Sequence, residues 1–140
     1  MPPTNVPVSV VANFSGVSYD PSTNQWSGDP TWNVPAKTAV RAGSNTIQWT
    51  LRPAAVPQGF VVSFPASLGI AFGTDWPYDD PGKQTDGTYT VNDTFTQPPA
   101  SVDYEYTVNV VITSEANTTI SKGFSYDPDI ENEGGSLSIE

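Results

Sequence analysis

Proline and glycine are spread along this chain at a density that argues against long helices. The 140 residues include 14 Pro and 11 Gly, and a proline inside a helix removes a hydrogen bond and clashes with the preceding turn. No window keeps apolar residues at helical spacing with suitable caps. The abundance of Val, Thr, Ser and aromatic residues favours strands. We therefore expect an all-β fold.

Two segments alternate apolar and polar residues, as half-buried strands do. In 46–51, Ile47, Trp49 and Leu51 share one face. The longer segment, 104–112, has an apolar face made of Tyr104, Tyr106, Val108, Val110 and Ile112. Weaker candidates occupy 8–14, 39–42, 60–64, 69–72, 88–91 and 119–126, and turn signals separate them. Seven or eight short strands predict a single antiparallel β-sandwich.

A short motif joins tyrosine, aspartate and proline. SYDP occurs at 18–21 and at 125–128, and YDDP stands at 78–81. Proline cannot donate to a sheet, and aspartate can cap the turn that follows, so Asp-Pro is a strand stop. We expect the first SYDP to end the first strand and the second to end the last. The sandwich then spans 1–128, and the acidic segment 129–140 forms a solvated tail.

The segment DYEYTVNVVI at 103–112 resembles the penultimate-strand motif of fibronectin type III and other immunoglobulin-like domains. The resemblance implies that Tyr104 forms a tyrosine corner and that Trp49 packs between the two sheets. Two features depart from it, since there is no cysteine pair and the 73–87 segment is long for a sandwich connection. The DGTYTV frame at 86–91 is a second candidate for the motif strand, and a jelly roll is the alternative fold.

The residue types present exclude several kinds of catalytic site. The chain has no His and no Cys, which excludes Ser-His-Asp triads, Cys-His pairs and the usual zinc centres. We therefore expect no enzyme activity. A carboxylate pair of glycosidase type among the loop acids is a less favoured alternative. A Ser-Lys dyad with Lys37 or Lys122 is less favoured still, because the lysine would need burial to lose its proton.

Charge and hydropathy restrict the classes of partner that the chain can bind. The net charge is −10 with five Lys plus Arg, which argues against nucleic acid, because binding there relies on clustered cations. No stretch approaches the ~20 apolar residues of a membrane helix, and the N-terminal sequence lacks a signal-peptide pattern. The sequence as written is thus expected to be cytoplasmic, without a membrane partner.

Aromatic residues outside the strand faces gather in two loop-like segments, 22–35 and 75–81. Rigid aromatic rings near carboxylates serve as anchors at protein interfaces, and they also suit stacking on sugars. The alternative is that they fold back as lids over the ends of the sandwich. The candidate binding residues are Trp26, Trp32, Trp76, Tyr78, Asp79 and Asp80.

Calcium is the one cofactor that the sequence leaves open, because hard cations take clustered oxygen ligands on loops. The candidate ligands are Asp75, Asp79, Asp80 and Asp86. The acidic segment 127–133 is a second cluster, and neither follows the EF-hand pattern.

The sequence as a whole predicts a non-enzymatic interaction or structural module. It is expected to bind a protein partner or to assemble with itself, for instance as an accessory part of a bacterial or phage assembly. The alternative is a small carbohydrate-binding module whose loop is ordered by calcium.

Overall fold

The computed structural model describes residues 4–65, 69–73, 76, 83–85, 87–96 and 100–134. Within these ranges no helix is long and apolar enough to span a membrane. The described backbone forms the strands β1 Thr4–Asn13, β2 Ser18–Asp20, β3 Gln25–Ser27, β4 Thr31–Asn33, β5 Lys37–Val40, β6 Gly43–Ala54, β7 Phe60–Ser63, β8 Ile70–Phe72, β9 Lys83–Thr85, β10 Thr88–Phe95, β11 Val102–Ser114, β12 Ser121–Tyr126 and β13 Asp129–Asn132. The expected all-β fold is confirmed.

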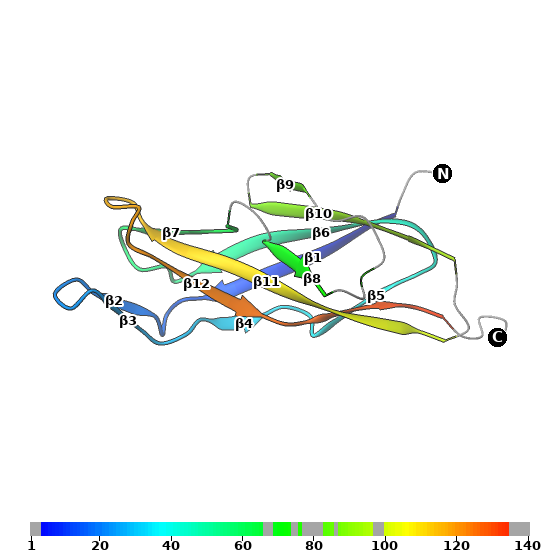
Figure 1. Cartoon of the computed structure of the whole chain (residues 1–140), viewed down its shortest axis with the longest axis horizontal. Helices are drawn as coiled ribbons and strands as arrows, with labels where there is room; N and C mark the ends of the chain where they lie inside the picture. The colour runs from blue at the N-terminus through cyan, green and yellow to red at the C-terminus, as the bar shows by residue number, and fades with distance from the viewer. Residues whose placement is uncertain are drawn as a thin grey trace.

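The strands stack in two layers that form an elongated sandwich (Figure 1). One layer has the order β4-β1-β6-β10-β9. The other is built around β11, which pairs with β7 and β8 on one side and with β12 and β13 on the other. β5 continues this second layer beyond β13. The hairpin of β2 and β3 is a separate two-stranded sheet at one end of the molecule (Figure 1).

The core lies between the two layers, and the alternation in the sequence explains which side chains fill it. Ile47 and Trp49 of β6 are fully buried, as is the run from Tyr106 to Ile112 at alternate positions of β11. The faces expected for these two strands are confirmed, and so is the place of Trp49 between the sheets. The Trp49 Nε1–H donates to the Tyr106 hydroxyl oxygen at 3.0 Å. Tyr104, which the resemblance singles out, is only half-buried.

Two strand pairs run parallel, so the sandwich is mixed rather than antiparallel throughout. β1 lies parallel to β6 from Thr4↔Asn45 to Asn13↔Ala54, and β13 lies parallel to β5. The other pairs among the described strands are antiparallel. Alternation in the sequence sets the face that a side chain occupies and carries no information on strand direction.

Every segment expected to be a strand overlaps an observed one. The sheet also extends past residue 128, because β13 pairs with β11 and β5. Ile130 of β13 is fully buried, whereas Asp129 and Glu131 beside it are partly exposed. The acidic segment 129–140 thus begins with a strand that its composition does not indicate. β2, β3, β4 and β9 have three residues each, which is too short for alternation to reveal.

The first SYDP does not end the first strand. β1 ends at Asn13, and Ser18–Asp20 forms β2. Asp20 does cap the following turn, since its Oδ1 accepts hydrogen bonds from the Ser22 hydroxyl at 2.7 Å and the Ser22 N–H at 2.9 Å. Both hydrogen bonds lower the pKa of Asp20, and the bond from the Ser22 hydroxyl lowers it more than the bond from the Ser22 N–H. The second SYDP ends β12 at Tyr126 as expected, and YDDP lies outside the described residues.

Candidate functional site

The structure separates the three candidate tryptophans instead of gathering them into one site. Trp26 belongs to the β2–β3 hairpin, Trp32 lies in β4, and Trp76 lies beyond β8. The remaining candidate residues, for binding and for calcium, lie outside the described part of the chain; they are Asp75, Tyr78, Asp79, Asp80 and Asp86. Among the described residues, no group of three or more acidic side chains could hold a metal ion.

Trp76 is part of the core. Only 8% of its surface is exposed, and its ring stacks on Phe72 with a centroid distance of 4.2 Å and an interplanar angle of 12°. The ring also meets Tyr104 edge-on at 5.2 Å. A ring covered on these sides offers little surface to a partner.

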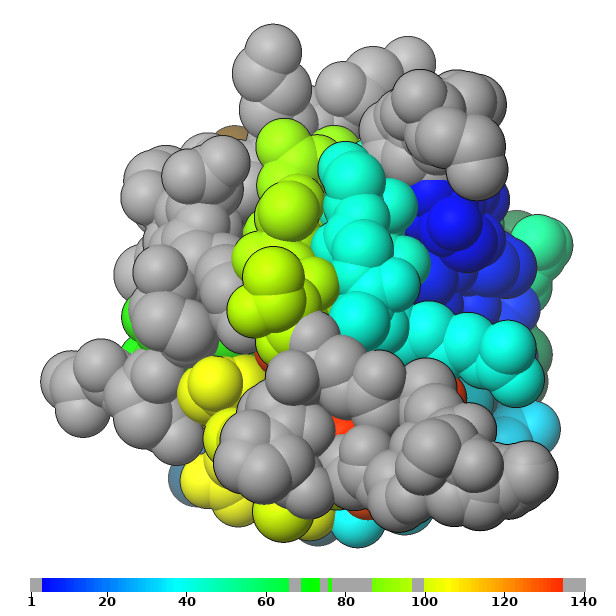
Figure 2. Space-filling view, turned by 90° about the vertical axis from the view of Figure 1, so that its right-hand side faces the viewer, coloured from blue at the N-terminus to red at the C-terminus, as the bar shows by residue number. Residues whose placement is uncertain are grey.

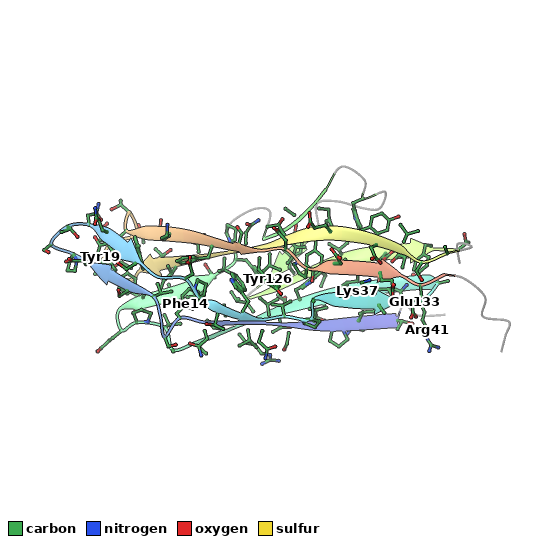
Figure 3. The ribbon with its side chains drawn as sticks, turned by 90° about the horizontal axis from the view of Figure 1, so that it is seen from below. Phe14, Tyr19, Lys37, Arg41, Tyr126 and Glu133 are labelled. Atoms are coloured by element: carbon green, nitrogen blue, oxygen red, sulfur yellow. The ribbon has the colours of Figure 1, made fainter. Side chains whose placement is uncertain are left out.

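Trp26 packs within the β2–β3 hairpin and against β7. Its ring lies 4.9 Å from Tyr19 and 5.3 Å from Phe60, measured between centroids. The Tyr19 hydroxyl donates to the Asn24 Oδ1 at 2.6 Å, and Tyr19 lies at one extreme end of the molecule (Figure 3). These contacts hold the hairpin against β7, since β2 and β3 pair with no other described strand.

Trp32 lines an open groove between the two layers. Its ring stacks on Tyr126 of β12 with a centroid distance of 5.6 Å and an interplanar angle of 17°. Tyr126 lies near the middle of the long axis (Figure 3). The groove has a volume of about 430 Å³ and is lined by Asp29, Pro30, Trp32, Lys122, Gly123, Phe124, Ser125 and Tyr126. Sequence reasoning selected Trp32 and missed Tyr126, because it treated that tyrosine as a strand end.

Two edge strands form the walls of this groove. Among the described strands, β4 is the last of its layer and pairs only with β1. In the described part of the chain β12 pairs only with β11, so its other edge faces the groove. An unpaired edge presents a row of backbone N–H and C=O groups that can accept another strand. The groove therefore combines free backbone groups with an aromatic pair.

The groove carries both charge signs, and its lining is polar and apolar in comparable parts. Phe124 is buried at 7% exposure and meets Phe14 edge-on at 5.9 Å. The Lys122 Nζ lies 5.6 Å from the Phe124 ring centroid, over its face. Asp29 lines the same groove. A bound chain would therefore meet aromatic rings together with polar groups, one cation and one anion.

A second unusual cluster is buried at the opposite end of the sandwich from the hairpin. Asp93 of β10 is fully buried. Asn45 of β6 and Asn132 of β13 are almost fully buried, at 4% and 1% exposure. The Asn45 Nδ2 donates to the Asp93 backbone oxygen at 3.0 Å, and the Asn132 Nδ2 donates to Asp93 Oδ1 at 3.2 Å. The start of β6, the end of β10 and β1 lie side by side at this end (Figure 2). The cluster thus ties the two layers together.

The Asp93 carboxylate is incompletely satisfied. Its Oδ2 is buried and has no hydrogen-bond partner. Burial raises the pKa of Asp93 to about 6, against a smaller lowering by the Asn132 bond. The sequence held a signal for this residue, because Tyr89, Val91 and Asp93 alternate along one face of β10.

Comparison with known proteins gives no assignment. No protein-family model matches the chain, and no curated protein matches it.

Proposed function

We propose that this chain is a non-enzymatic interaction module, and that the groove between β4 and β12 binds an extended segment of a protein partner. The observation that carries the proposal is the free edge of β12 beside the Trp32–Tyr126 pair. An extended segment is the ligand whose backbone matches the spacing of an open strand edge. The aromatic pair supplies a place for one apolar side chain of that segment.

Charge favours a basic partner segment. The chain carries a net charge of −10, so its field attracts cations and speeds their encounter. Asp29 lies in the groove itself. An accessory domain of a larger bacterial or phage assembly is one setting in which such a module would work.

Peptide selection tests this function. A random peptide library displayed against the whole chain should yield extended, basic sequences. We expect Trp32→Ala to weaken their binding about tenfold to thirtyfold, as for an aromatic anchor worth about 2 kcal/mol. Fluorescence anisotropy with labelled peptides measures the change. Trp26→Ala is the matched control, because Trp26 is another half-buried tryptophan on the core and lies outside the groove.

Gly123 allows a paired charge test of the same groove. A Cβ at Gly123 would meet only the Val110 carbonyl oxygen at 3.8 Å, so a side chain fits there without strain. Gly123→Lys should weaken a basic peptide, and Gly123→Glu should retain or strengthen it. Equal binding by both variants and by Trp32→Ala would show that the peptides bind elsewhere.

A second candidate is a small carbohydrate-binding module. The observation that favours it is the size of the groove, about 430 Å³, which lies in the range of small-ligand sites, together with its aromatic pair. A glycan array tests it. Hits that Trp32→Ala abolishes, with the Gly123→Lys and Gly123→Glu variants affected alike, would favour sugar over a basic peptide.

We further propose that the sandwich is of the immunoglobulin-like class. Support comes from the buried Trp49 between the layers, and from β11 pairing with the β12–β13 segment that follows it in the chain. The hydrogen bond from the Trp49 Nε1–H to the Tyr106 hydroxyl oxygen joins β6 and β11 across the two layers.

A further inference from the structure

The first strand contributes a full row of core side chains. Val8, Val10 and Ala12 of β1 are at most 2% exposed, and Phe14, just beyond the strand, is 1% exposed. β1 lies between β4 and β6 and pairs with β6 over its whole length. Without β1, the sandwich would have a slot between β4 and β6, bounded by β6 along the whole length of β1 and by β4 only at the positions of residues 11–13. Only an extended strand with the same alternation could refill this slot.

A short connection, residues 14–17, links β1 to the strands that follow it. Ser15 and Gly16 are exposed in this connection, whereas Phe14 and Val17 on either side are buried. Its turn is closed by the Val17 N–H donating to the Phe14 carbonyl oxygen at 3.0 Å. Straightening the turn at Ser15 and Gly16 would carry β1 and Phe14 away together. The hairpin that follows pairs with neither layer, so it does not hold β1 in place through strand pairing.

We propose that two copies of this chain exchange β1, so that residues 4–14 of each copy fill the slot between β4 and β6 of the other. The exchanged contacts are the same as those within one copy, and only the conformation of the connection differs. Such exchange is therefore a low-cost route to a dimer, favoured by high concentration.

The composition of β1 does not oppose a second copy as the occupant. The chain as a whole carries a net charge of −10, so two copies repel each other. The strand TNVPVSVVAN contains no Asp, Glu, Lys or Arg, and thus enters a second acidic copy without adding to this repulsion. The proposal concerns the slot between β4 and β6 and does not depend on the groove beside β12.

Cross-linking between differently marked copies tests the exchange. Ser9 and Thr50 are register partners on the outer face of β1 and β6, and the chain has no native cysteine. Full-length Ser9→Cys and Thr50→Cys chains are mixed at high concentration and treated with a short bifunctional thiol reagent. We expect a covalent heterodimer whose digestion joins the peptides that contain the two new cysteines.

The control uses the other neighbour of β6. Thr50 is also the register partner of Thr88 in β10, and β10 lies between β9 and β11 in the chain. Thr88→Cys and Thr50→Cys chains mixed in the same way report random collision, and the Ser9 pair should give several-fold more heterodimer. A chain carrying both Ser9→Cys and Thr50→Cys shows that the reagent reaches the pair.

The outcomes separate clearly. Equal heterodimer from the Ser9 and Thr88 mixtures would overturn the exchange, as would no heterodimer from a mixture whose doubly substituted chain reacts. Asn5 and Thr46 form a second outer-face pair between β1 and β6. The same mixing with Asn5→Cys and Thr46→Cys decides the question if either Ser9→Cys or Thr50→Cys fails to fold by circular dichroism.

Discussion

Replacing Trp49 with alanine is expected to lower the free energy of unfolding by about 3–5 kcal/mol, the range for buried Phe and Trp side chains cut back to alanine. Trp49 is 0% exposed, and its ring meets Tyr106 at 5.3 Å, Phe72 at 6.2 Å and Tyr89 at 6.4 Å between centroids. The alanine leaves a cavity between the layers. Urea denaturation followed by far-ultraviolet circular dichroism at neutral pH measures the loss.

Tyr106→Phe separates the hydrogen bond from the packing. The Trp49 N–H then lies buried without its acceptor, which costs about 1–3 kcal/mol. Burial raises the pKa of Tyr106 to about 12, so its hydroxyl is neutral throughout the measurement. Val61→Ala, at a side chain 47% exposed, is the surface control and should change stability by less than about 0.5 kcal/mol. A loss at Trp49→Ala as small as that of the control would contradict a core centred on this residue.

The parts of the fold that the sequence predicts are those in which apolar and polar residues alternate over several positions. β6 and β11 have such alternation, and their buried faces follow from it. Burial of one face drives both strand formation and register, because a slip of one residue would expose every apolar side chain. For this reason Trp49 could be placed in the core before the structure was known.

Strand direction and strand neighbours depend on contacts that are distant in the sequence. β1 pairs in parallel with β6, and β4 and β12 meet across the groove, although nothing local in either segment marks its neighbour. The groove exists because Trp32 and Tyr126 come from different layers. Trp76 shows the converse, since a loop-like sequence with Asp and Pro neighbours places its tryptophan in the core. Local polarity is thus a poor guide to the burial of a single aromatic residue.

Replacing Asp93 with asparagine is expected to make the protein more stable at neutral pH. Burial raises the pKa of Asp93 to about 6 in the folded state, while the unfolded chain has an aspartate pKa near 3.9. Between these values the folded state holds a proton that the unfolded state has lost, so stability falls as pH rises. As the pH rises from below 4 to 7, the Asp93 carboxyl group therefore lowers the free energy of unfolding of the native chain by about 3 kcal/mol. Asparagine has no charge to bury and can still accept from Asn132.

The measurement compares Asp93→Asn with the native chain by urea denaturation across pH 4 to 7. The free energy of unfolding of the variant minus that of the native chain should increase by about 2–3 kcal/mol from pH 4 to pH 7. Glu105→Gln, at an exposed position of β11, removes the same charge from the surface, so an effect of overall repulsion would appear in both variants. A difference for Asp93→Asn that is flat with pH, or that shrinks as pH rises, would mean that the carboxylate finds a compensating partner on folding. A rising difference would instead show that the two layers are joined at this end by a group that prefers to be protonated, so the tie between β10 and β13 strengthens in mild acid.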